Sequence, residues 1–294
     1  MKHIKQKEFC LMKFLDSLRP SARLYRLVAL GLTALASLLG VLALFLDYDT
    51  HIGYYSNGAI LPIALAVVCV ASVVFFAVFA ILRFRGLPSA YAKKPSLAVR
   101  ITAFASAALA LYLAITDLHS GASIFVLLLG LGTCLYFLLM ATEKATPALS
   151  LAFGFCTILR MVVEVVRSYT DLLIPMNSPE KIWLHLAAVA GIFFLISELR
   201  AIIAKPYTAT YFFAAATATL LGTTSALILL LGNLTHRFYG TATRGSVIFA
   251  LLFLAFSIYA GARFFAVVLC PTEAAEKQDE LTEETEITEE TEQN

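Results

Sequence analysis

The chain has 294 residues, of which 60% are hydrophobic and 14% charged, and its formal net charge is +2. Soluble domains are about 45–50% apolar and about 25% charged, so a soluble fold is excluded, because it would not bury this much apolar surface. The apolar residues also fall in separate runs of roughly 18 to 25, each long enough to cross about 30 Å of hydrocarbon as a helix. The composition therefore predicts an all-α, polytopic membrane helical bundle that is embedded in a lipid bilayer.

The first segment, residues 1–22, is basic and carries apolar side chains on one helical face. Leu11, Phe14, Leu15 and Leu18 share that face, and lysines and arginines flank them. This pattern is typical of an amphipathic helix that lies on the inner leaflet of the membrane. A basic segment without fixed structure is the alternative.

Eight apolar runs follow and predict a transmembrane domain over residues 23–270. We expect spans at residues 23–46, 59–82, 98–116, 122–141, 147–168, 181–203, 207–231 and 245–269, with boundaries accurate to about 2–4 residues. The seventh run is rich in small and hydroxyl residues, which let helices approach closely, so we expect it near the centre of the bundle. A weak resemblance of spans two and three to spans six and seven would, if real, make a parallel repeat of four plus four spans.

Basic side chains gather in the connections on one side of these spans. The N-terminal segment up to Arg26, the connections at 83–100 and 142–146 and the end of the sixth span together contain fifteen lysines and arginines. The connections at 47–58 and 117–121 contain none, and those at 167–181 and 232–244 contain four: Arg167, Lys181, Arg237 and Arg244. Loops rich in lysine and arginine stay in the cytoplasm, which predicts that both termini are cytoplasmic. The short loops are typical of a bacterial cytoplasmic membrane.

The last segment, residues 271–294, is an acidic low-complexity tail. The sequence LTEETE at 281–286 is followed by ITEETE at 287–292, and the tail has no aromatic residue. Such a composition predicts a disordered, solvated segment. Both cytoplasmic termini are candidate contacts for a protein partner. Nucleic acid is not expected as a partner, because the basic excess of the body is explained by topology.

Three charged side chains lie within the fifth span, which is the least apolar of the set. Arg160, Glu164 and Arg167 are spaced i, i+4 and i+7, so they share one helical face. Arg160 lies about 20 Å along the helix, near the bilayer midplane, where a lone charge costs about 2.5–3.5 kcal/mol. Two readings remain open. The face lines a polar cavity in which Arg160 holds an anionic ligand, or a buried Arg160–Glu164 pair fixes helix packing while Arg167 reaches the interface.

Other polar residues are weaker candidates. His185, about one turn inside the sixth span, is a further ligand candidate, although a hydrogen-bonded interfacial histidine is the better explanation. The aspartates and histidines of the outer connections, Asp117 and His119 among them, show no metal-ligand spacing. Glu198 can pair with Arg263, but we expect these side chains to reach toward cytoplasmic water instead.

Three classes of function fit this organisation. We favour a small-solute transporter or permease, because eight spans carry almost no extramembrane mass and one of them has a charged face, although the Gly- and Pro-broken helix pairs of many transporters are absent. The alternative is a non-enzymatic scaffold or receptor-type component that binds a partner through its cytoplasmic termini. A third reading is an intramembrane enzyme acting on a lipid-linked substrate. No catalytic, cofactor-binding or metal-binding motif is found.

Overall fold

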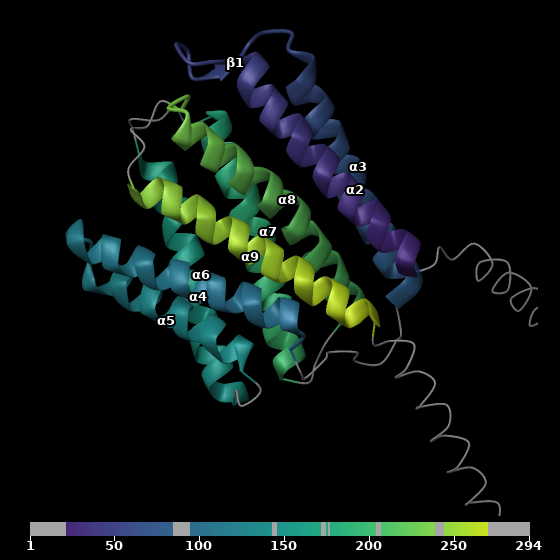
Figure 1. Cartoon of the computed structure of the whole chain (residues 1–294), viewed down its shortest axis with the longest axis vertical. Coiled ribbons are helices and arrows are strands. Elements are labelled where there is room, and N and C mark those ends of the chain that lie inside the picture. The colour runs from purple at the N-terminus through teal and green to yellow at the C-terminus, as the bar shows by residue number, and fades with distance from the viewer. Residues whose placement is uncertain are drawn as a thin grey trace, which may run out of the picture.

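The computed structural model describes residues 22–84, 95–142, 146–171, 175, 177–203, 207–238 and 244–269. Within these ranges the chain forms eight long α-helices, a short π-helix and a two-stranded hairpin (Figure 1). Residues 1–21 and 270–294 lie outside the described residues, so the amphipathic N-terminal segment and the disordered tail stay predictions.

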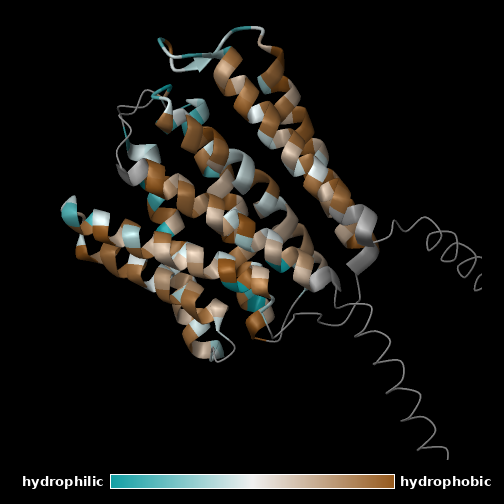
Figure 2. Cartoon of the chain, viewed as in Figure 1, coloured by the Kyte–Doolittle hydropathy of each residue, from teal (hydrophilic) through white to brown (hydrophobic). Residues whose placement is uncertain are grey.

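The eight helices follow the eight predicted spans closely. They are α2 (Ala22–Leu42), α3 (Ile60–Phe84), α4 (Leu97–His119), α5 (Ile124–Ala141), α6 (Pro147–Thr170), α7 (Pro179–Ile202), α8 (Thr208–Leu234) and α9 (Arg244–Leu269). All eight are long and apolar enough to cross a membrane, including α6, the charged fifth span. Apolar residues cover the helices along their lengths, and polar residues gather at helix ends (Figure 2). The predicted polytopic helical bundle is confirmed.

Local sequence signals set several helix boundaries. Pro147 and Pro179 stand in the first turns of α6 and α7, where the missing amide hydrogen costs nothing. The hydroxyl of Ser178 caps α7 by accepting from the amide of Lys181. At the end of α8, His236 has a positive φ of 52° and the next amide bonds back to the carbonyl of Gly232. This αL ending stops the helix three residues beyond its predicted end.

Six of the helices form a closed ring. Each of α4, α5, α6, α7, α8 and α9 packs against the next, and α9 packs against α4 to close the ring. The remaining two helices, α2 and α3, pack against each other and against α8 from outside the ring (Figure 1). The bundle is therefore a six-helix ring with a peripheral helical pair.

Helix α8 joins the ring to the peripheral pair, as its composition predicts. Of the eight spans it has the largest buried share, 67%, and it contacts α2, α3, α7 and α9. Small residues permit this: a side chain at Gly222 would overlap the hydroxyl of Ser257 on α9. The hydroxyls of Ser37 on α2 and Thr224 on α8 are hydrogen-bonded at 3.4 Å. The predicted central position of this span is confirmed.

The ring argues against the predicted repeat of four plus four spans. In such a repeat α3 and α4 would correspond to α7 and α8. Helices α7 and α8 pack closely, whereas α3 packs on α2 and α8 and α4 packs on α5 and α9. The resemblance between these segments reflects a shared apolar composition rather than a shared arrangement.

A short hairpin that the sequence reading missed follows the first span. Helix α2 continues as the π-helix η1 (Ala43–Asp47), and the strands β1 (Tyr48–Asp49) and β2 (Tyr54–Tyr55) pair antiparallel. The guanidinium of Arg237, just beyond α8, donates to the carbonyls of Leu44 and Phe45 at 3.1 and 3.0 Å. We call this end of the bundle the hairpin end. Ala22 and Leu269, the first and last described helical residues, lie at the opposite end (Figure 1).

Replacing Gly222 by leucine is expected to destabilise the protein. The new side chain would have to push α9 away from α8, and overpacking of this kind costs about 1–3 kcal/mol or more. The matched control is Gly31→Leu on α2, because Gly31 is exposed and nothing lies within 4 Å of an added Cβ. Thermal unfolding in detergent should show a Tm several degrees lower for Gly222→Leu only. Equal Tm values for both variants would contradict the assigned α8–α9 interface.

Candidate functional site

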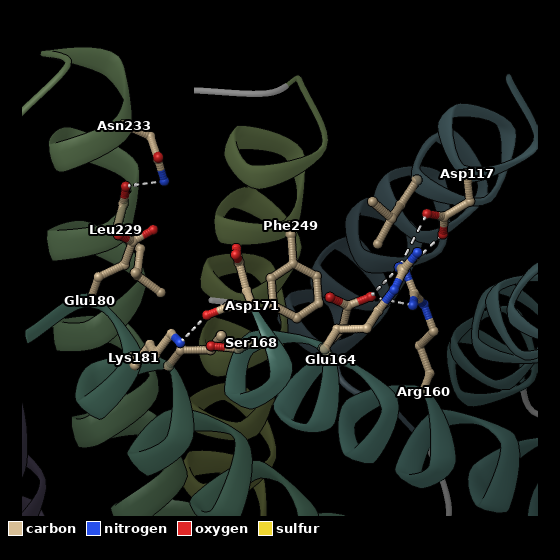
Figure 3. A pocket seen from close by; sticks show the side chains of 13 residues that line it. Asp117, Arg160, Glu164, Ser168, Asp171, Glu180, Lys181, Leu229, Asn233 and Phe249 are labelled. Atoms are coloured by element: carbon tan, nitrogen blue, oxygen red, sulfur yellow. Dashed lines mark hydrogen bonds and ion pairs between the residues drawn. The ribbon is translucent and has the colours of Figure 1, made fainter. Parts of the chain in front are cut away.

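A half-open cavity of about 350 Å³ lies in the hairpin-end half of the ring (Figure 3). Five ring helices contribute to its lining: α4, α6, α7, α8 and α9. Four apolar residues also line it. The polar lining residues are Asp117, Arg160, Glu164, Arg167, Ser168, Asp171, Glu180, Lys181 and Asn233. Charged groups therefore dominate the lining of this cavity.

One wall of the cavity is an ionic network between α4 and α6, which we call the paired wall. Arg160 is buried, with 3% of its surface exposed. Its Nη2 lies 2.7 Å from Oδ2 of Asp117, and its Nη1 donates to Oε1 of Glu164. Nη1 of Arg167 lies 3.3 Å from the same Glu164 oxygen and 3.7 Å from Oδ1 of Asp117. Two acids and two bases thus neutralise each other on this wall.

The facing wall is formed by Glu180, Lys181 and Asn233, and we call it the open wall, because its two charged residues form no ion pair with any residue that the structure describes (Figure 3). Lys181 is 1% exposed, and its ammonium donates one hydrogen bond, of 2.6 Å, to the backbone carbonyl of Asp171. Among the described residues no carboxylate forms an ion pair with Lys181, and Glu180 has neither a hydrogen bond nor an ion pair. Asn233, 4% exposed, uses its amide nitrogen on the carbonyl of Leu229.

The structure brings three of the four sequence-derived candidates together. Arg160, Glu164 and Arg167 lie on one face of α6 and line the cavity, although the Arg167 side chain is 47% exposed. His185 is separate from them, because it is half-buried on α7 and does not line the cavity. Its Nε2 is buried without a hydrogen-bond partner among the described residues, so the expectation of a hydrogen-bonded histidine is wrong at this nitrogen.

Sequence reasoning missed the partners that complete the site. Asp117 looked like an ordinary helix-end aspartate, and nothing in the sequence indicates that α4 faces α6 across the ring. Lys181 stands at the predicted boundary of the sixth span, whereas in the structure it lies inside the first turn of α7. The Ser178-Pro179 pair, a cap followed by a first-turn proline, is a signal that would have placed Glu180 and Lys181 inside the helix.

A second ionic cluster lies in the opposite half of the ring, and we call it the sealed pair. Glu198 on α7 is completely buried, and Arg263 on α9 is 5% exposed. Nε of Arg263 lies 3.0 Å from Oε1 of Glu198. The hydroxyls of Tyr136 and Tyr259 donate to the two carboxylate oxygens at 2.6 and 2.7 Å. The expectation that Glu198 and Arg263 reach toward water is therefore wrong.

Aromatic rings pack between the cavity and the sealed pair. The rings of Phe137 and Phe194 lie 6.0 and 5.8 Å from that of Phe256, one turn of α9 before Tyr259. A Cβ at Gly191 would lie 2.9 Å from Phe256 and 3.3 Å from Met161, the residue that follows Arg160. Large side chains therefore fill the space between the two ionic clusters.

Replacing Arg160 by methionine should destabilise the protein strongly. Asp117 and Glu164 would then face each other without the arginine that bridges them, and breaking a buried pair in this way costs about 3–5 kcal/mol. In an Asp117→Asn, Glu164→Gln background the same replacement should cost little, because no buried carboxylates remain. Unfolding in detergent measures both effects, and an equal loss in the two backgrounds would contradict the network.

Loss of Glu198 should destabilise the protein more than loss of Arg263. Glu198→Ala leaves a buried guanidinium and two tyrosine hydroxyls without their acceptor, and we expect a loss of about 3–5 kcal/mol. Arg263→Met leaves the carboxylate with its two hydroxyl donors, so we expect a clearly smaller loss. Unfolding of the two variants in the same detergent measures the order, and a reversed order would show that the tyrosines do not stabilise the carboxylate.

Among the described residues, no group of three or more histidine, cysteine, aspartate or glutamate side chains is placed to hold a metal ion. Comparison of the chain with protein-family models, with curated proteins and with solved structures finds no match.

Proposed function

We propose that the protein is a membrane transporter or permease for a small polar solute, which enters the cavity from the hairpin end. The observation that carries the proposal is the charged cavity inside a closed ring of six membrane-spanning helices. The volume of about 350 Å³ is near the lower end of ligand pockets, which span about 300–1,000 Å³. At roughly 30 Å³ per water molecule, it holds about a dozen waters, which suits a small solute.

The cost of charge in a membrane supports a functional role for the cavity. A charged side chain near the bilayer centre costs about 2.5–3.5 kcal/mol on insertion scales. Apolar side chains often pack helices as well as a buried ion pair does. The cavity is lined by Asp117, Arg160, Glu164, Arg167, Asp171, Glu180 and Lys181. Packing alone gives no reason to gather so many charges around a cavity, whereas recognition of a polar solute does.

The position of the sealed pair supports transport rather than reception alone. The cavity lies at the hairpin end, and the aromatic rings and the Glu198–Arg263 pair fill the ring beyond it. Such an arrangement corresponds to a pathway that is open at one end and closed at the other. Transport then requires that the closed half opens while the cavity half closes, as in alternating access.

The distribution of lysine and arginine gives this pathway a direction. It favours an orientation with the hairpin end outside the cell and both termini in the cytoplasm. The cavity then faces the exterior of a cytoplasmic membrane, and the sealed pair lies nearer the cytoplasm. Uptake is the direction that this topology favours.

Cysteine labelling from the two sides of the membrane tests transport directly. The experiment uses full-length, otherwise cysteine-free variants in vesicles of either orientation and a membrane-impermeant maleimide. Ser168→Cys, which lines the cavity without altering its charges, should react from the hairpin end. Met140→Cys, buried beside Arg263, should react from the opposite side whenever the closed half opens.

The control is Val74→Cys on α3, which is 56% exposed along an apolar helix and should react from neither side, because lipid covers it. Reaction of Ser168→Cys alone would indicate a receptor-like cavity and contradict transport. Reaction of neither cavity nor inner cysteine in a folded protein would contradict an aqueous site altogether.

A further inference from the structure

The two walls of the cavity differ in whether their charged side chains form ion pairs within the protein. On the paired wall, Arg160 and Arg167 already face the carboxylates of Asp117 and Glu164. On the open wall, Lys181 and Glu180 form no ion pair with a described residue. A charged solute would therefore gain the most from contacts with the unpaired side chains of the open wall.

Lys181 specifies one group of that solute. Its ammonium has three donors and uses one of them on the backbone carbonyl of Asp171. The side chain is 1% exposed, so only the cavity side of the ammonium is open to a further partner. A buried ammonium is costly unless an anion lies beside it. A carboxylate on the solute would supply that anion.

Glu180 and Asn233 specify a second group. The Glu180 carboxylate lines the cavity and accepts no hydrogen bond within the described residues. The amide of Asn233 donates to Leu229, which leaves its oxygen as an acceptor beside the cavity. Acceptors of this kind match a group with several N–H donors and a positive charge. An ammonium on the solute has both properties.

The charges of the lining disfavour both a simple anion and a simple cation. Asp117, Glu164, Asp171 and Glu180 are acidic, and Arg160, Arg167 and Lys181 are basic, so acids exceed bases by one. An anion would add to this excess, and a cation would leave Lys181 without a partner. A solute that carries both charges leaves the balance unchanged and satisfies both groups.

We propose that the cavity binds a small zwitterion that carries a carboxylate and an ammonium close together, the chemistry of a free α-amino acid. Lys181 holds the carboxylate, and Glu180 with Asn233 holds the ammonium. Glu180 and Lys181 are consecutive residues in the first turn of α7 and both line the same cavity, so one small solute can contact both. This inference rests on the proposed function and names the solute class of the same site.

Equilibrium binding to the full-length protein in nanodiscs tests the solute class. The zwitterionic probes are glycine, L-alanine and L-serine. Propanoate is L-alanine without the ammonium, and ethylamine is L-alanine without the carboxylate. At least one zwitterion should bind, and L-alanine should bind about tenfold or more tightly than propanoate or ethylamine, because each analogue loses a charge-assisted contact. Propanoate or ethylamine binding as tightly as L-alanine would overturn the two-group assignment.

Variants of the open wall assign the two contacts. Lys181→Met and Glu180→Gln should each weaken binding of the zwitterion about tenfold or more. Lys181→Met should not lower the Tm, since it removes a buried charge that lacks an ionic partner, and this separates loss of recognition from loss of fold. Arg200→Met is the control, because Arg200 is exposed over the ring of Tyr207 at the far end of α7, and binding should be unchanged.

The two proposals fail in different ways. If none of the three zwitterions binds while the cavity and inner cysteines both react with maleimide, the solute class is wrong and transport stands. If a zwitterion binds but Met140→Cys never reacts, the solute class stands and transport is wrong. Unchanged affinity in both Lys181→Met and Glu180→Gln would overturn the assignment of the open wall.

Discussion

The neutralisation of Arg160 is the constraint on which the cavity half of the ring depends. A guanidinium near the middle of a membrane-spanning helix must find anions, and Arg160 finds one on its own helix and one on α4. Because Asp117 comes from a different helix, satisfying the charge also fixes how α4 stands relative to α6. On the facing wall, α7 and α8 present Glu180, Lys181 and Asn233 to the cavity, and neither Glu180 nor Lys181 forms an ion pair with a described residue.

The two ionic clusters show how similar chemistry can have opposite consequences. Around Glu198, two hydroxyl donors and a guanidinium supply every partner within the protein, and aromatic rings exclude water. Around Arg160, both terminal guanidinium nitrogens have anionic partners while Nε has no hydrogen-bond partner among the described residues, and a cavity adjoins the network. The two clusters therefore differ in their surroundings more than in their pairing, and the proposed function rests on that difference.

Much of the fold and part of the site follow from the sequence. Apolar runs predict the eight spans because hydrocarbon imposes one length on every helix, and helical periodicity predicts that Arg160, Glu164 and Arg167 share a face. Neither rule specifies which helices are neighbours. The sequence therefore does not predict the contribution of Asp117, the pairing of Glu198 with Arg263 or the ring of six helices. All three depend on contacts between segments far apart in the chain. The sequence also does not predict that Lys181 lines the cavity, because its helix begins two residues before the predicted start.

The peripheral position of α2 and α3 has a consequence for how the protein is made. These two helices precede the ring helices in the chain, yet the helix they pack against, α8, is the seventh of the eight spans. The bond between Ser37 and Thr224 joins residues 187 positions apart. Helices α2 and α3 are therefore inserted before α8 is available. Until then the Ser37 hydroxyl of α2 lacks its partner Thr224 and faces lipid. The ring itself closes only when α9 packs against α4, so the last helix to be inserted completes the cavity.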